Sequence, residues 1–245
     1  MKRKVFMPFL ILGLSLFMFN CSSNENNPVT PNEKPEPQQP AVQQVELPQS
    51  VTNSSDSHAA QAVMWAGMVN SFSAYSSYFS PPQGTKSLLK TNDDGSWTYT
   101  WTVDSLVITL LYEQNAESIS WKVTLNGSDS QSETVYVNWT MLEASQTTDG
   151  SSGTITMYDD NSTDIIFTLT WSKDSDGTEN YEYINPADGG GKIVFTVHPE
   201  NSGDVQMYNH LDGQYIVWMK VAWTASGGEW WEYDEQGNVS NHGSF

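Results

Sequence analysis

The sequence predicts a mainly β protein (α+β), with one N-terminal amphipathic helix packed on a long, curved antiparallel meander sheet that is half-barrel or barrel-like. Two features of the 245-residue chain predict this architecture. Apolar residues recur at steps of three and four up to about residue 79, and beyond Gly95 they recur at steps of two. A single domain over 56–245, about 190 residues, is large enough to bury about 70% of its unfolded surface.

The first twenty residues have the composition of a signal peptide. Lys2, Arg3 and Lys4 precede an apolar run over 5–19. That run is shorter than the ~20 residues that a membrane-spanning helix needs, and it matches the apolar region of a secretory signal. The sequence therefore predicts a signal peptide over 1–20, with an uncleaved single-pass anchor as the alternative.

Cys21 is the only cysteine of the chain, so it has no partner for an internal disulfide. The run Met18-Phe19-Asn20-Cys21 resembles the lipobox of bacterial lipoproteins, although Met and Asn stand where that motif prefers Leu and a small residue. The resemblance implies lipidation of Cys21 with acyl chains such as palmitate. It also implies a protein of the bacterial cell envelope, anchored in a membrane that we expect to be the outer one. An ordinary secretory signal with an incidental cysteine is the alternative.

Residues 21–55 predict a disordered tether between the anchor and the folded domain. Prolines from Pro28 to Pro48 alternate with Asn, Gln, Glu and Ser, and apolar residues are few. Such a segment cannot bury enough apolar surface to offset the entropy of ordering it. Proline also keeps the chain semi-extended, which lets the domain stand away from the bilayer.

The helix is predicted over 56–79. Ser55 or Asp56 can accept hydrogen bonds from the free amides of its first turn, and Pro81-Pro82 ends it. The apolar positions that share one side of this helix are Trp65, Met68, Phe72, Tyr75 and Phe79. We expect this aromatic stripe to pack on the sheet, and a mobile lid over a cavity is the alternative.

About nine to eleven strands are predicted after Gly95. The alternation of apolar and polar residues is clearest over 97–103, 119–125, 135–141, 165–171 and 215–223. Turn signals such as Asn126-Gly127 and Asp212-Gly213 separate the runs, and strands joined by such short turns pair antiparallel. A curved sheet wrapped around the helix is the first choice, a closed barrel the second and a sandwich the third.

The charge of the chain excludes nucleic acid as a partner. There are 29 acidic residues against 10 lysines and arginines, which gives a formal charge of −19. Phosphate binding needs clustered Lys and Arg, and the single arginine, Arg3, lies in the predicted signal peptide.

No catalytic residue is predicted, and we expect a protein that is not an enzyme and needs no cofactor. The four histidines lie in no recognisable signature, and the paired carboxylates lie mostly beside Gly or Asn in turns. A weak calcium candidate is the group of Asp174, Asp176 and Glu179, because hard oxygens near a glycine are typical of calcium loops. A plain acidic hairpin turn is the alternative.

Tryptophans supply the weak candidates for ligand binding, and the adjacent pair Trp230-Trp231 points to opposite faces if its segment is a strand. Indoles at the rim of a sheet can stack on sugar rings or line a lipid cavity. The alternative is that they fill a wide, thin core. The candidates are Trp65, Trp97, Trp101, Trp121, Trp230 and Trp231.

The order of elements over about 56–235 resembles the LolA/LolB group of lipoprotein carriers and receptors. That resemblance implies a curved sheet that cups a helix and holds acyl chains in an apolar concavity. The first hypothesis for function is therefore an envelope lipoprotein that binds an apolar ligand such as a lipid. A surface adhesion or glycan-binding module that uses Trp230 or Trp231 is the alternative, and an enzyme is the third possibility.

Overall fold

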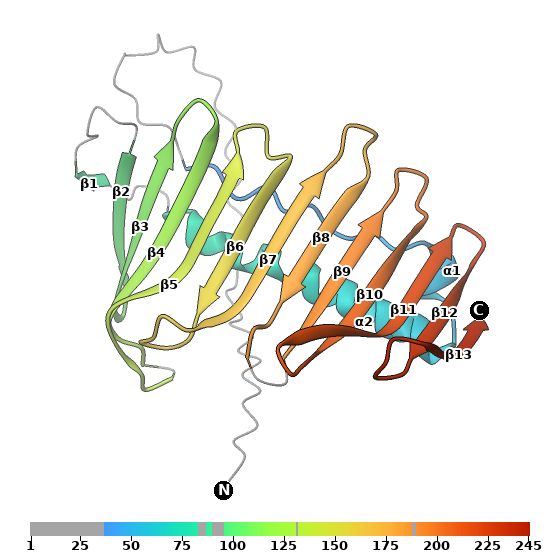
Figure 1. Ribbon diagram of the computed structural model, residues 1–245. Coiled ribbons are helices and arrows are strands. Elements are labelled where there is room, and N and C mark those ends of the chain that lie inside the picture. Colours follow the sequence, from blue (N-terminus) through green and yellow to red (C-terminus); the bar gives the residue numbers. More distant parts are fainter. Residues whose placement is uncertain (1–36, 83–86, 90–95, 131, 188–189) are drawn as a thin grey trace, which may run out of the picture. The chain divides into compact units, whose positions relative to one another are not determined.

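The computed structural model describes residues 37–82, 87–89, 96–130, 132–187 and 190–245. The predicted signal peptide, Cys21 and the first part of the predicted tether lie outside these residues. The described chain forms one antiparallel sheet of thirteen strands, each hydrogen-bonded to the strands before and after it in the sequence. Figure 1 shows the helices lying across one face of this sheet.

The strands and helices have the following bounds. The strands are β1 (Ser87–Leu89), β2 (Ser96–Val103), β3 (Ser105–Gln114), β4 (Ser118–Ser128), β5 (Val135–Thr147), β6 (Ser152–Tyr158), β7 (Ile165–Lys173), β8 (Glu179–Ile184), β9 (Gly191–Val197), β10 (Gly203–Leu211), β11 (Gln214–Thr224), β12 (Gly227–Tyr233) and β13 (Val239–Ser244). The helices are α1 (Gln49–Thr52), α2 (Ser57–Ser71) and the 3₁₀ helix η1 (Phe72–Phe79). Among the described residues, no helix is long and apolar enough to span a membrane.

The predicted class, mainly β with an antiparallel meander, is confirmed, and the number of strands exceeds the nine to eleven expected. The sheet is open, with β1 and β13 at its two edges, so it is neither a closed barrel nor a sandwich. The turns are short, and Asp104 and Asp212 adopt positive φ angles of 53° and 48°. Asp tolerates this left-handed conformation in tight turns, which keeps successive strands adjacent.

Helix α2 packs on the sheet through small residues. Ala59, Ala62 and Ala66 are at most 4% exposed, and Val69 is 1% exposed. The sheet side chains opposite are large, so small helix residues let the two backbones approach closely. Trp65 of the predicted stripe packs against the core but is only half-buried, because the inward face of α2 is rotated toward the alanines.

The helix predicted over 56–79 changes type at Phe72, where η1 begins. The hydroxyl of Ser71 donates to the carbonyl of Met68 at 2.6 Å, a bond that competes with the helical backbone ladder. Beyond this point the aromatics Phe72 and Tyr75 are three residues apart. Side chains at this spacing align in a 3₁₀ helix, which keeps both rings against the core.

The folded unit begins at Pro37, inside the segment that the sequence assigned to the tether. Val45 is 4% exposed, and its N–H donates at 2.7 Å to the side-chain carbonyl of Asn70 on α2. The side-chain amide of Asn70 donates in turn to the carbonyl of Val45 at 3.0 Å. This paired contact and the burial of Val51 offset the entropy of ordering residues 37–48, a proline-rich segment that we call the N-terminal strap.

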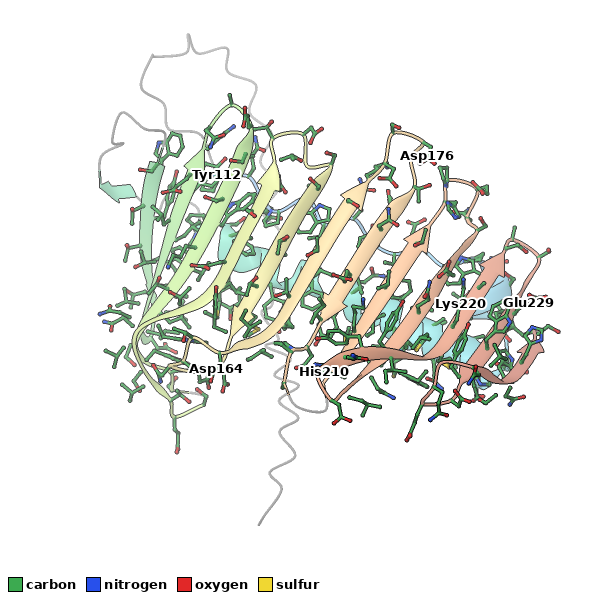
Figure 2. All side chains as sticks on the ribbon, viewed as in Figure 1. Tyr112, Asp164, Asp176, His210, Lys220 and Glu229 are labelled. Carbon is green, nitrogen blue, oxygen red and sulfur yellow. The ribbon has the colours of Figure 1, made fainter. Side chains whose placement is uncertain are left out.

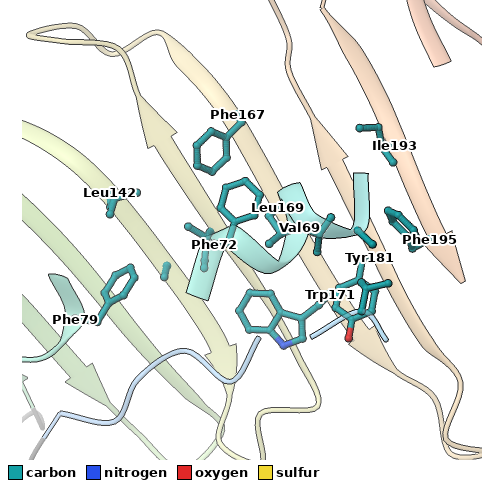
Figure 3. Close-up of a cluster of buried hydrophobic side chains, with 14 of the residues drawn as sticks. Val69, Phe72, Phe79, Leu142, Phe167, Leu169, Trp171, Tyr181, Ile193 and Phe195 are labelled. Atoms are coloured by element: carbon teal, nitrogen blue, oxygen red, sulfur yellow. The ribbon is translucent and has the colours of Figure 1, made fainter. Parts of the chain in front are cut away.

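The core lies between the helices and the covered face of the sheet. Figure 3 shows Val69 and Phe72 among side chains from the central strands, including Phe167 and Trp171. Phe72 contacts Phe167 edge to face, with ring centroids 4.6 Å apart.

Three of the core tryptophans each lie directly opposite a glycine on the neighbouring strand. The cross-strand pairs are Gly153 with Trp171, Gly203 with Trp223, and Gly243 with Trp230. In each pair a Cβ atom on the glycine would collide with the indole ring. Each tryptophan therefore lies flat over a neighbouring backbone, which lets large rings fill a thin layer.

Candidate functional site

Strand alternation gives the sheet two chemically different faces. The covered face carries the buried core, and the opposite face, which we call the open face, carries hydroxyl, amide and charged side chains. On β4, for example, Trp121 and Val123 are buried, whereas Ser120, Lys122 and Thr124 between them are partly or fully exposed.

Five of the six candidate tryptophans belong to the core side of the molecule. Trp121 is 1% exposed, and its indole N–H donates to the carbonyl of Gln38 at 2.7 Å. Trp97 lies 5.6 Å from the ring of Tyr112. The five residues that pack in or against the core are Trp65, Trp97, Trp101, Trp121 and Trp230.

The adjacent Trp230 and Trp231 point to opposite faces of β12. Trp230 stacks on His58 with ring centroids 3.7 Å apart and an interplanar angle of 13°. Trp231 lies on the open face, where it stacks on His242 of β13 at 5.1 Å. Of the six candidates, Trp231 is therefore the one whose ring an external ligand can reach across the open face.

His58 joins the start of α2 to β12. Its Nδ1 lies 3.1 Å from a carboxylate oxygen of Asp56, the N-cap of α2, and its Nε2 lies 3.1 Å from a carboxylate oxygen of Glu232. The pKa of Glu232 is lowered by hydrogen bonds from His58 and Asn241. The two carboxylates and the Trp230 ring hold the helix end against the sheet.

Glu232→Gln should lower the melting temperature at pH 7, because the carboxylate that faces His58 is lost. A lowered folded-state pKa stabilises the fold above the ordinary value of 4.5, and this contribution disappears as pH falls through the folded value. The difference between wild type and variant should therefore shrink as pH falls below about 4.5. Thermal denaturation across pH 3 to 7 measures it. Glu235→Gln, in the exposed turn that follows, is the control, and equal pH profiles for both variants would contradict the contact.

The C-terminal strands carry a group of aromatic and cationic side chains on the open face, which we call the aromatic end. Lys192 lies 4.5 Å from the ring centroid of Tyr208 and 5.5 Å from that of Tyr215. Lys220 lies 5.9 Å from the ring of Trp231. Figure 2 labels Lys220 and His210 on this part of the sheet. The aromatic end consists of Lys192, Tyr208, His210, Tyr215, Lys220, Trp231 and His242.

A chain of polar contacts holds the groups between these rings. The hydroxyl of Tyr208 donates to the side-chain carbonyl of Gln206 at 2.8 Å, and the amide of Gln206 donates to Asp204 at 3.1 Å. Asp204 pairs with Lys220 at 3.6 Å. Burial and the nearby carboxylate of Asp204 raise the pKa of Tyr208, so its hydroxyl stays a donor at neutral pH. The aromatic end therefore offers flat rings beside fixed hydrogen-bonding groups.

A shallow hollow of about 370 Å³ opens on strands β3 to β6. Within it Lys122 pairs with Glu143 at 2.9 Å, and the hydroxyl of Tyr158 donates to Glu143 at 2.6 Å. The hydrogen bond from Tyr158 and the nearby Lys122 lower the pKa of Glu143, and the same bond raises the pKa of Tyr158 to about 12. The open-face residues that line the hollow are Leu111, Glu113, Ser120, Lys122, Glu143, Ser145, Thr154 and Thr156.

The three calcium candidates do not converge on one point. Glu179 pairs with Lys173 at 2.9 Å and accepts from the hydroxyl of Tyr181. Asp176 accepts from the N–H of Thr178, as is usual in a hairpin turn. Within the described part of the chain, no three His, Cys, Asp or Glu residues are placed to hold a metal ion.

The residues of the aromatic end, apart from Trp231, and those of the hollow were not singled out from the sequence. They occupy the polar half of the strand alternation, which is usually solvated and carries no motif. Only the register of the strands brings them together. Comparison with protein-family models, with curated proteins and with solved structures finds no match to this chain.

Proposed function

We propose that this protein is a bacterial cell-envelope lipoprotein without enzymatic activity, which binds a glycan on the open face of its sheet. Acyl chains on Cys21 would hold it at the membrane. The observation that carries the glycan assignment is the stack of the half-buried Trp231 on the exposed His242, beside the polar chain of Lys220, Asp204, Gln206 and Tyr208.

The chemistry of a sugar suits this surface. A pyranose ring presents a face of C–H groups, which packs on an aromatic ring, and a rim of hydroxyls, which need donors and acceptors at fixed positions. Trp231 supplies the aromatic surface, and Lys220 with its carboxylate partner supplies a donor and an acceptor. Because Gln206 and Tyr208 are already hydrogen-bonded to their neighbours, little side-chain entropy is lost when a ligand binds.

An apolar ligand such as a lipid is the second candidate. Helix α2 carries no acidic or basic side chain apart from His58, and its outward residues Val63 and Met64 are 38% and 55% exposed. A lipid would lie between α2 and the covered face, as the resemblance to the LolA/LolB group implies, and the helix would have to move. The two hollows described on the surface are open, and most of the residues that line them have polar side chains, which favours the glycan. Titration with phospholipid vesicles, followed by tryptophan fluorescence, tests the lipid.

Trp231→Ala should weaken glycan binding by about tenfold or more, or about 1.4 kcal/mol, because a central stacked tryptophan commonly dominates such an interface. A glycan array identifies a ligand, and calorimetry measures its affinity for both proteins. Met64→Ala removes an exposed apolar side chain from α2 and should leave the affinity unchanged. An array on which no glycan binds would overturn the proposal.

Cys21→Ser should move the protein from the membrane fraction to the soluble extracytoplasmic fraction, because two or three acyl chains are needed for firm anchoring. Fractionation of cells that express each form measures the change. Mass spectrometry of the N-terminal peptide should find the acyl chains on wild-type Cys21. An unmodified cysteine in that peptide would contradict the anchor and leave the glycan site unaffected.

A further inference from the structure

We propose that the ligand is a long, uncharged polysaccharide, bound in an extended form across the strands so that it contacts both the aromatic end and the hollow over β3 to β6. This inference rests on the proposed glycan-binding function and names its substrate class. It makes the hollow a second contact site for the same chain.

The two sites lie along one continuous row of paired residues. Each strand from β2 to β13 contributes one open-face residue that is directly opposite the next in the register, and we call this line the long row. Its members in strand order are Ser96, Glu113, Ser120, Ser145, Thr154, Thr170, Glu182, Val194, Gln206, Lys220, Trp231 and His242. Four of them, Glu113, Ser120, Ser145 and Thr154, line the hollow.

The spacing of the long row suits an extended sugar chain. Neighbouring strands lie about 4.8 Å apart, which is close to the length of one pyranose residue in an extended polymer. Ser120 on β4 and Trp231 on β12 are separated by eight strand spacings, or about 38 Å. A ligand of about eight sugar residues would therefore reach from the hollow to the aromatic end.

From the hollow to β7 the long row carries only short hydroxyl side chains. Ser145, Thr154 and Thr170 follow one another on β5 to β7, and the hydroxyl oxygens of Thr154 and Thr170 lie 3.4 Å apart. These short side chains offer hydroxyl groups as both donors and acceptors. Larger groups flank this stretch: Lys122 pairs with Glu143 at the hollow, and Glu182 pairs with Lys192 on β8 and β9. Lys220 beside Trp231 follows further along, and these groups can hold the chain.

The charges on the open face favour an uncharged polymer. Each lysine beside the long row has a carboxylate partner: Lys122 pairs with Glu143, Lys192 with Glu182 and Lys220 with Asp204. The positive charge of each of these three lysines is therefore already paired and does not neutralise the carboxylate of an acidic sugar. The whole chain carries a charge of −19, which repels polyanions. Binding of the neutral chain should accordingly change little with salt.

The test is a chain-length series with defined probes. Oligomers of three and eight residues from xylan and from β-1,3-glucan serve as neutral chains, and alginate serves as the anionic polymer. We expect the eight-residue oligomer to bind at least tenfold more tightly than the three-residue oligomer, because the second contact is made within one complex. The double variant Lys122→Met with Glu143→Gln should abolish this gain and leave the affinity for the short oligomer unchanged.

The outcomes distinguish a failure of this inference from a failure of the proposed glycan-binding function. Equal affinities for short and long neutral oligomers, or a double variant that behaves like the wild type, would overturn the extended chain and leave glycan binding intact. Tighter, salt-dependent binding of alginate would overturn the uncharged class. Binding of none of these probes, while other glycans bind on the array, would overturn the inference alone, and an empty array would overturn both. Circular dichroism of the double variant checks that it is folded.

Discussion

Trp121→Ala should lower the free energy of unfolding by about 3–5 kcal/mol, the range for truncating a large buried aromatic residue. Trp121 is 1% exposed, and its ring contacts Phe79 and Tyr112, each at a centroid distance of 6.0 Å. It also ties the N-terminal strap to the sheet, because its N–H donates to the carbonyl of Gln38. The substitution therefore removes core volume and leaves that carbonyl without its donor.

Urea denaturation followed by circular dichroism measures the loss. Trp121→Phe keeps most of the ring and removes the N–H, so it should cost less and should expose the strap near Gln38 to protease. The matched control is Trp231→Ala, the same substitution on the open face, which should cost about 1 kcal/mol or less because Trp231 lies outside the core. Similar losses at the two positions would contradict the division of the sheet into a covered and an open face.

The sequence predicted the strands well because the two-residue alternation reports directly which residues face the core. Trp121 and Leu125 were recognised in this way, and the structure buries both. The helix was harder to place. Its buried contacts are made by Ala59, Ala62 and Ala66, and alanines give a weak apolar signal beside Trp65 and Met68. The periodic pattern therefore identified Phe72 and Phe79, which the structure buries, and missed the alanines.

The openness of the sheet could not be read from the sequence, because closure depends on whether the first and last strands meet. Nothing in the alternation of β13 distinguishes an edge strand from an interior one. The candidate site was hidden for a similar reason. Glu113 and Trp231 are 118 positions apart in the sequence and share one row only because nine successive registers place them there.

The two faces also divide the roles of the tryptophans. A tryptophan on the covered face adds stability by filling space beside a glycine, whereas one on the open face leaves its ring available to a ligand. Trp230 and Trp231 show this division on adjacent residues, since one stacks on the histidine of α2 and the other on the histidine of β13. Stability and binding can thus be altered separately in this protein.

Gly153→Ala should lower the free energy of unfolding by about 1–3 kcal/mol, although the change adds only one methyl group. Gly153 is paired across the strands with Trp171, which is 4% exposed. A Cβ atom at Gly153 would overlap the Trp171 ring and would lie 2.6 Å from the carbonyl oxygen of Ser145. The backbone oxygen cannot move without breaking the pairing of β5 with β6, so the indole must leave its position.

Gly67→Ala is the matched control, because the same methyl group is added at a place with no atom within 4 Å. Gly67 lies inside α2, where alanine is favoured over glycine, so this variant should gain about 0.5–1 kcal/mol. Urea denaturation of both variants measures the two opposite changes. A variant at Gly153 as stable as the wild type would mean that the Trp171 ring does not lie against the neighbouring strand, and the same doubt would then extend to the pairs at Gly203 and Gly243.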